Sequence, residues 1–299
     1  MGEVSGLIAA LIWATTNIMM RSQSDRFDIL TLNAIRVLGA VPIALLLPVL
    51  IGSGPGVLQS PPLALVYIVA GGMSAMGIGD TIYYTSQKIL GVSRAQPISN
   101  IYPIFTLALA ALFLGEQATW ALGVAIVLVV AGIYLLTEKR DNLSSSAAAG
   151  KDARLGVALA VAAGFWWAVG TVLFRQGMLD LSVFTANQLR IPAVGIALLG
   201  VVRLTGRPMQ FGSYGWRTLL IVGGAGVLGI GLGSLLFLYS VQTTSAAKAA
   251  LLSSMSPFFG APLAALFLGE QLTWRAVFGM LLCVVGVWLI FFPSVLGLS

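Results

Sequence analysis

A tandem repeat constrains this chain more than any other feature. Residues 108–120 read ALAALFLGEQATW and residues 262–274 read PLAALFLGEQLTW, so 11 of 13 positions agree at an offset of 154 residues. The same offset, without a gap, superposes further residues in pairs: Trp13 and Trp167, Arg36 and Arg190, Gly79 and Gly233, and Pro103 and Pro257. Self-similarity at a fixed offset is the signature of a duplicated structural unit. The chain is therefore predicted to consist of two copies of one unit.

Each copy contains five long apolar runs. Only 9% of the 299 residues are charged and the mean hydropathy is +0.98, whereas a soluble domain carries about 25% charged residues. A helix that crosses a bilayer needs about 20 mostly apolar residues. The runs predict an all-α, polytopic membrane protein with ten transmembrane helices at residues 4–22, 29–51, 62–86, 95–115, 118–137, 154–175, 182–204, 214–240, 247–268 and 272–293.

The odd number of helices in each copy has a geometric consequence. Residues 1–137 form the first five-helix repeat, residues 138–153 a Ser- and Ala-rich linker, and residues 154–299 the second repeat. The second repeat must enter the membrane from the opposite side, so the two are inverted repeats of one transport unit. Inverted repeats are a physical basis for alternating access. The alternative is a duplicated scaffold that transports nothing.

The basic residues predict which side of the membrane each loop occupies. Of the 16 Lys and Arg residues, two (Arg36 and Arg190) lie within helices and two (Arg175 and Lys248) lie on the face that carries the termini. The others lie on the opposite face. Because short cytoplasmic loops are enriched in Lys and Arg, we expect a multi-pass protein of a bacterial-type inner membrane with both termini outside the cytoplasm. Loop charge also accounts for the net charge of +6 without a nucleic-acid partner.

The residue types exclude several chemistries. The chain has no histidine and a single cysteine, Cys283, which excludes a disulfide within the chain, a Cys/His zinc site and a Ser-His-Asp triad. The Gly77-Ile78-Gly79 segment is not a nucleotide-binding fingerprint, because no strand is predicted before it and it lies within a membrane span. We expect no metal, no cofactor and no enzymatic activity. An intramembrane enzyme or a receptor subunit remains the alternative from another class, with little support.

The repeated motifs resemble those of a known family. They are the Ile12-Trp13-Ala14 start of the first helix, Arg36 and Arg190, and the Pro103 and Pro257 segments that run into the two Leu-Gly-Glu motifs. This pattern resembles the ten-helix EamA-type transporters of the drug/metabolite transporter superfamily, and within it most of all the YddG-type aromatic amino acid exporters. The resemblance implies a single-chain carrier whose central cavity is walled by helices 1 to 4 and 6 to 9, with helices 5 and 10 at the periphery.

Polar side chains inside the spans are candidate substrate ligands, because such groups are costly in a bilayer, and two tryptophans would wall the site between them. Trp13 and Asn17 share one helix face, as do Trp167 and Thr171 in the second copy. The alternative is that the tryptophans pack and the amides and hydroxyls only join helices. The predicted substrate-binding residues are Trp13, Asn17, Tyr84, Gln96, Ser99, Asn100, Trp167, Thr171, Asn187, Arg190, Ser253 and Ser254.

Asp80 is the one carboxylate well inside a predicted span. It lies about 9 Å from the cytoplasmic end of helix 62–86, and Arg36 lies about 11 Å from the same side in helix 29–51. Matching depths predict a buried ion pair, since neither charge is tolerated alone in hydrocarbon. The alternative is that Asp80 binds and releases a driving proton.

The second copy keeps the arginine but replaces the acid. Arg190 aligns with Arg36, whereas Ser234 aligns with Asp80. An arginine without a protein carboxylate can receive one from a substrate. The alternative is that Arg190 pairs with Asp180, Glu116 or a lipid phosphate.

Glycines and prolines are the candidate moving parts. Helices 62–86 and 214–240 are rich in glycine, which permits both bending and close packing. Pro103 and Pro257 are expected to kink helices 95–115 and 247–268. The predicted gating or coupling residues are Arg36, Asp80, Gly77, Gly79, Pro103, Gly231, Gly233 and Pro257.

These observations predict a secondary active or facilitative exporter of small amphipathic metabolites. Aromatic or apolar amino acids are the preferred substrates. Organic cations and drugs, or nucleotide-sugar-like solutes, are the alternatives. The expected partners are the small-molecule substrate and the lipid bilayer, and ten helices suffice for a monomer to function.

Overall fold

The structure is a computed structural model that describes residues 1–21, 23, 28–52, 56–117, 119–137, 151–206, 214–268 and 273–291. Most of the predicted linker 138–153 lies outside these residues. Its last three residues already belong to a helix, α9, which begins at Lys151 rather than at the predicted residue 154. The charged start of α9 therefore extends beyond the apolar run from which its boundary was predicted.

The described residues form the ten predicted membrane helices, several of them in two or three pieces. Eight described stretches are long and apolar enough to cross a membrane, and α8 is a shorter apolar helix. In chain order the helices are α1 (Gly2–Arg21), α2 and α3 (Ile29–Gly39, Val41–Leu50), η2 (Gly56–Gln59), α4, η3 and α5 (Pro62–Gly72, Met73–Gly79, Asp80–Leu90), α6 and α7 (Val92–Ser99, Tyr102–Leu114), α8 (Trp120–Thr137), α9 (Lys151–Gly177), α10 (Val183–Leu204), α11, η6 and α12 (Trp216–Ala225, Gly226–Gly233, Ser234–Thr243), α13 and α14 (Ala246–Ser253, Ser256–Leu268) and α15 (Trp274–Phe291).

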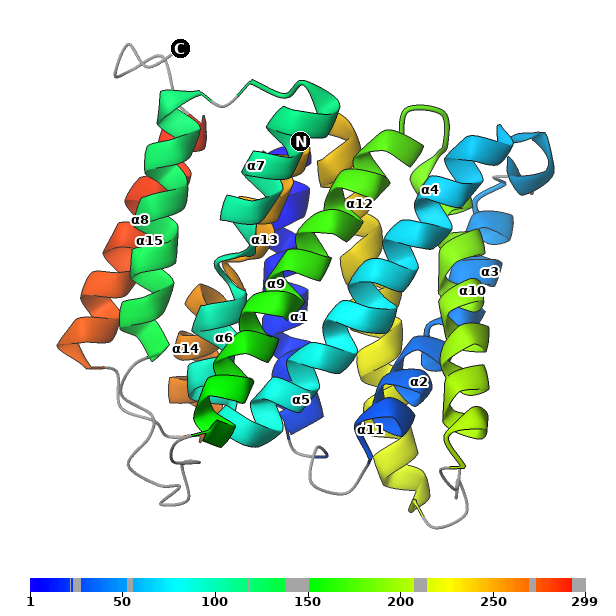
Figure 1. The fold of residues 1–299 in the computed structure, drawn as a ribbon, viewed down its shortest axis with the longest axis horizontal. Coiled ribbons are helices and arrows are strands. Elements are labelled where there is room, and N and C mark those ends of the chain that lie inside the picture. The colour runs from blue at the N-terminus through cyan, green and yellow to red at the C-terminus, as the bar shows by residue number, and fades with distance from the viewer. Residues whose placement is uncertain are drawn as a thin grey trace.

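The two halves run in opposite directions. Figure 1 shows α1 starting at the upper face and descending, whereas α9, its counterpart in the second half, starts at the lower face and rises. The described end of α15 returns to the face where α1 begins. The protein is therefore an all-α polytopic membrane protein of two inverted five-helix repeats, as predicted.

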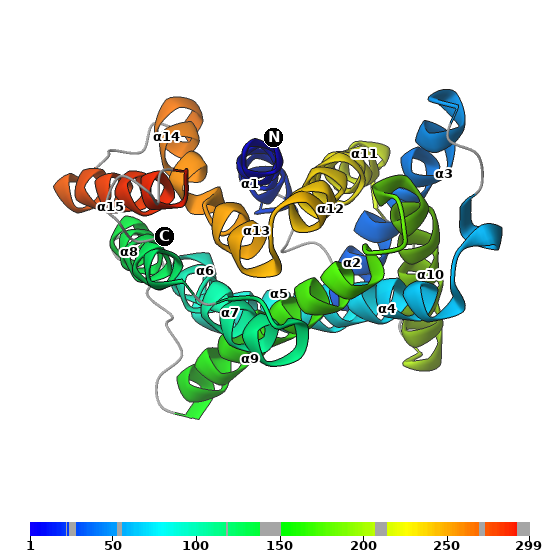
Figure 2. The same cartoon turned by 90° about the horizontal axis from the view of Figure 1, so that it is seen from above.

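The fifth and tenth helices, α8 and α15, pack against each other at one edge of the molecule (Figure 2). Glycine allows this close contact. A Cβ built on Gly132 would lie 2.5 Å from the carbonyl oxygen of Gly279, and one built on Gly286 would lie 2.9 Å from that of Ala125. A buried apolar cluster fixes the pair to α13. The peripheral position expected for these two helices is confirmed.

The third and eighth helices each contain a π-helical segment, η3 and η6, at equivalent places. A π-helix has i→i+5 hydrogen bonds and frequently occurs at functional sites. The glycines predicted to gate these helices are closely packed at three positions: a Cβ would lie 2.7 Å from Trp167 at Gly79, 2.5 Å from Ile43 at Gly231 and 2.9 Å from Trp13 at Gly233. Gly77 meets only Met73, at 3.8 Å. Close packing accounts for three of the four glycines.

The fourth and ninth helices are interrupted near their midpoints. The α6 helix ends at Ser99 and α13 ends at Ser253, and Pro103 and Pro257 each stand second in the following helix. Proline suits the first turn of a helix, where its missing N–H is not needed. In place of the kinks predicted at these prolines, each helix is broken just before its proline.

Candidate functional site

A cavity of about 160 Å³ lies between the two halves. Its wall includes residues from all eight of the helices expected to surround it, and from neither α8 nor α15. Nine of the twelve residues predicted to bind substrate line this cavity: Trp13, Asn17, Tyr84, Gln96, Asn100, Trp167, Thr171, Arg190 and Ser253. Arg36 and Asp80 line it as well.

Three predicted substrate ligands lie outside the cavity wall. The Ser99 hydroxyl donates to the carbonyl oxygen of Ala95 at 2.9 Å, and the Ser254 hydroxyl donates to that of Leu251 at 2.7 Å. Both serines satisfy the backbone of their own helix, as serine commonly does. Asn187 lies behind the cavity and accepts a hydrogen bond from Arg190.

The tryptophans Trp13 and Trp167 occupy equivalent positions but have different hydrogen-bond acceptors. The Trp167 indole donates from Nε1 to Oδ1 of Asp80 at 2.8 Å. The Trp13 indole donates from Nε1 to the carbonyl oxygen of Gly229 at 2.9 Å. Each ring lies on a glycine of the facing π-helical segment. The two halves therefore hold their indoles in similar places.

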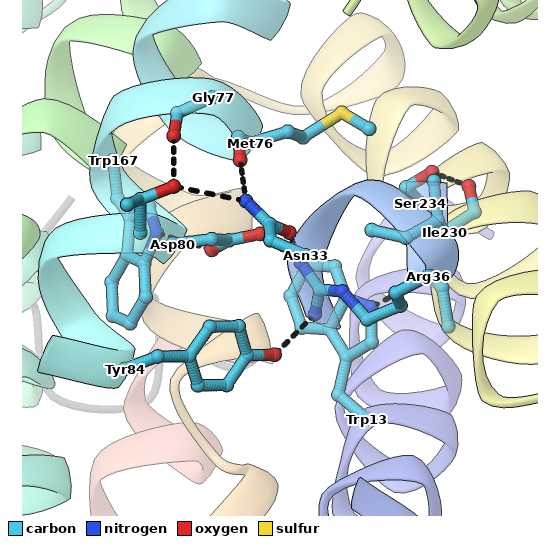
Figure 3. A network of polar contacts seen from close by, with 12 residues as sticks. Trp13, Asn33, Arg36, Met76, Gly77, Asp80, Tyr84, Trp167, Ile230 and Ser234 are labelled. Atoms are coloured by element: carbon cyan, nitrogen blue, oxygen red, sulfur yellow. Dashed lines mark hydrogen bonds and ion pairs between the residues drawn. The ribbon is translucent and has the colours of Figure 1, made fainter. Parts of the chain in front are cut away.

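The predicted ion pair between Arg36 and Asp80 is present (Figure 3). The two side chains are 13% and 16% exposed. Arg36 also donates from Nη1 to the Tyr84 hydroxyl at 2.7 Å and from Nη2 to Oδ1 of Asn33 at 3.1 Å. The amide of Asn33 in turn donates to the carbonyl oxygen of Met76 at 2.8 Å. This network ties α2 to η3 and α5.

Arg190 repeats this arrangement without an acid. Its Nε donates to Oδ1 of Asn187 and its Nη2 donates to the Ser234 hydroxyl, both at 2.8 Å. Its Nη1 lies 3.6 Å from the sulfur of Met76, and its guanidinium lies 4.7 Å from the centre of the Phe174 ring. The residue is 1% exposed. Among the residues that the structure describes, no carboxylate pairs with Arg190.

The acidic partners considered for Arg190 are engaged elsewhere or lie apart. Glu116 accepts hydrogen bonds from the backbone N–H groups of Ala246, at 2.8 Å, and Ala247, at 3.4 Å, at the start of α13. It also forms an ion pair with Arg175 at 3.7 Å. Asp180 lines a separate groove near the start of α10. The alternative that Arg190 pairs with Asp180 or Glu116 is therefore wrong.

Sequence reasoning missed several residues of the cavity wall. Ser234 could have been found, because the repeat aligns it with Asp80. Tyr102 gave no such signal, since aromatic residues are common in membrane helices. Its hydroxyl donates to the carbonyl oxygen of Ala250 at 2.6 Å and contacts the Ser253 hydroxyl. The other missed residues are Thr16, Ala75, Met76, Tyr83, Phe174, Ala225, Gly229, Ile230, Phe237 and Ser256.

Two buried donors of the cavity have no acceptor in the described part of the chain. They are Nδ2 of Asn100 and Nε of Arg36. Asn100 is 7% exposed. A buried polar group without a partner is costly. These donors are therefore available to a bound solute.

Inverted helical repeats around a central cavity with polar groups are typical of membrane transporters. The chain belongs to the EamA-like transporter family, whose model matches residues 1–138 and again residues 154–292. An uncharacterized transporter of Archaeoglobus fulgidus is 26% identical over 289 residues, 96% of both chains. An uncharacterized transporter of Clostridium kluyveri is 22% identical over 222 residues, 74% of this chain and 70% of the relative.

The fold also matches a solved structure. A protein crystal structure superposes with a TM-score of 0.82, covering 100% of this chain and 98% of the other, at 17% sequence identity. At this identity the match shows the fold alone. The family and the fold together make the chain a multi-pass membrane transporter.

Proposed function

We propose that this transporter exports small amphipathic metabolites, with aromatic or apolar amino acids as the preferred substrates, by alternating access. The carrying observation is the cavity between the inverted halves, which combines two indoles with amide, hydroxyl and guanidinium groups. Ligand sites are mostly apolar with a few placed polar groups. A solute with an apolar side chain and a polar head matches this lining, which supports the YddG-type substrate class.

The size of the cavity favours a small solute. At about 160 Å³, it lies below the roughly 300–1,000 Å³ of typical ligand pockets. A nucleotide sugar has several rings and two phosphates, so it does not fit this volume. The dimensions support the amino acid class over the nucleotide-sugar alternative.

The charge of the cavity disfavours organic cations. The described side chains that line it include two cations, Arg36 and Arg190, and one anion, Asp80. The carboxylate of Asp80 already accepts from Arg36 and Trp167. A drug cation would therefore enter a site of net positive charge without a free acid.

We further propose a position in the membrane. The basic loops place residues 138–152 in the cytoplasm and both termini outside it, in a prokaryotic cytoplasmic membrane. In this proposal the protein acts as a monomer, because residues of one chain enclose the cavity. It moves its solute without enzymatic chemistry. A reporter enzyme that is active only outside the cytoplasm should be active when it is fused after Ser299. A fusion whose reporter lies in the cytoplasm would contradict this topology.

Uptake into liposomes that contain the purified protein tests the transport proposal. Labelled phenylalanine, leucine, a sugar, an organic cation and a nucleotide sugar are compared, with and without a pH gradient. We expect uptake of the amino acids alone. Asp80→Asn tests proton coupling, because transport that loses its dependence on the gradient but keeps exchange would assign the proton to Asp80.

Variants of the indoles test the cavity itself. Trp13→Ala and Trp167→Ala should each reduce uptake by tenfold or more, because each removes an apolar wall. Trp274→Ala is the matched control, since Trp274 is exposed at the start of the peripheral helix α15. Unchanged uptake in both cavity variants, or uptake of no solute at all, would contradict the proposal.

A further inference from the structure

Arg190 is a buried cation in the cavity wall without a counter-ion in the described chain. Its equivalent in the first half, Arg36, has the Asp80 carboxylate. Arg190 has the Ser234 hydroxyl at the same sequence separation of 44 residues. The surrounding groups are the Asn187 amide oxygen, a thioether and a phenyl ring, all neutral. Neutral groups compensate a buried charge incompletely.

The hydrogen bonds of Arg190 leave part of its guanidinium without a strong acceptor. Its Nη1 meets only the Met76 sulfur at 3.6 Å, and a thioether is a weak acceptor. The hydroxyl of Ser234 donates its own proton to the carbonyl oxygen of Ile230, so it can serve Arg190 only as an acceptor. The site is therefore short of negative charge.

Other groups of the cavity share this shortage. Nε of Arg36 and Nδ2 of Asn100 are buried donors without an acceptor in the described structure. The one described acid of the wall, Asp80, already accepts from Arg36 at one oxygen and from Trp167 at the other. A ligand that satisfies this wall must bring acceptors and negative charge. A carboxylate has two oxygens and about four acceptor positions.

We propose that Arg190 is the binding residue for a carboxylate of the substrate, so that the transporter selects small apolar solutes with a free carboxylate group. This inference rests on the proposed function and names the chemical group that the cavity recognises. Arginine suits this role, because its planar donors match a carboxylate in a bidentate manner. The solute would complete in the second half the ion pair that Asp80 completes in the first.

Four compounds that share a phenyl ring test the proposal. They are 3-phenylpropanoate, phenylalanine, phenylalaninamide and 2-phenylethylamine, measured by calorimetric titration of the protein in nanodiscs and by competition for uptake in liposomes. We expect the two carboxylates to bind at least tenfold more tightly than the amide and the amine. Chloride is titrated separately, and competition by chloride equal to that of the carboxylates would overturn carboxylate selection.

Two variants of the site and one control assign the effect to Arg190. Arg190→Gln should weaken binding of both carboxylates by at least tenfold. Ser234→Asp should do the same in a folded protein, because it supplies an internal carboxylate where the first half has Asp80. Arg203→Gln is the control, since Arg203 is exposed on the same helix. Wild-type carboxylate affinity in Ser234→Asp would overturn the proposal.

The outcomes separate the two levels of inference. If the amide or the amine is bound and transported as well as the carboxylates, Arg190 does not select a carboxylate, while the carrier proposal stands. If the only solute transported in the wider panel lacks a carboxylate, the same conclusion follows. If no solute is transported, the carrier proposal fails and the assignment of Arg190 fails with it.

Discussion

Replacing Asp80 by asparagine removes the negative charge from the ion pair with Arg36 and keeps the size of the side chain. The pair is 13% and 16% exposed, so water compensates little of the remaining charge. Removing one partner of a buried pair costs about 3 to 5 kcal/mol. We expect this loss in the free energy of unfolding of Asp80→Asn, a change of about 10² to 10⁴ in the unfolding equilibrium. Reversible denaturation in mixed micelles measures it.

The double variant Arg36→Gln/Asp80→Asn makes the reasoning refutable. Breaking a buried pair by removing one partner is costly because it leaves an uncompensated charge, and removing both charges avoids that cost. We expect the double variant to have a higher free energy of unfolding than Asp80→Asn alone, because no uncompensated buried charge remains. A double variant as unstable as the sum of the two single variants would show that the charges are not coupled.

Two further comparisons each set one variant against a matched control. Gly226→Ala should lower the free energy of unfolding by about 1 to 3 kcal/mol or more, because a Cβ there would lie 1.9 Å from the carbonyl oxygen of Arg36. Gly223→Ala is the control and should be neutral or stabilising in the same denaturation assay, because a Cβ there would have no described atom within 4 Å. Equal losses in the two variants would refute the packing argument. Trp167→Phe and Trp13→Phe remove the same ring area, but the first loses a hydrogen bond to a carboxylate and the second one to a carbonyl. We expect Trp167→Phe to cost about 1 kcal/mol more, and a larger loss from Trp13→Phe would contradict this difference.

The arrangement of helices and the ion pair could be predicted from the sequence. The repeat determines the inversion, because five helices per copy reverse the direction of the second copy. The pairing of Arg36 with Asp80 followed from their equal depths, since a bilayer leaves few other partners for an isolated charge. A disturbance of the fourth and ninth helices near Pro103 and Pro257 was predicted as a kink from the missing proline N–H, although its form, a break ahead of each proline, was not.

Other features of the site could not be predicted from helical periodicity. The faces assigned to Ser99 and Ser254 assumed continuous helices, but both helices break at these residues and the hydroxyls return to the local backbone. The π-helical segments follow from tertiary packing on their glycines, which no local pattern encodes. Phe174 and Tyr102 were missed because an aromatic residue in a membrane helix is more often a packing residue.

The charge of the cavity is distributed asymmetrically, because Arg36 pairs with a carboxylate and Arg190, within the described chain, does not. Arg36 lies seven residues from the start of α2 and Arg190 lies seven residues from the start of α10, and these helices enter from opposite faces. Arg36 is neutralised by Asp80, while no described carboxylate neutralises Arg190. A bound carboxylate solute would therefore have a fixed orientation along the membrane normal. Exchanging the residues at positions 80 and 234 would turn that solute end for end.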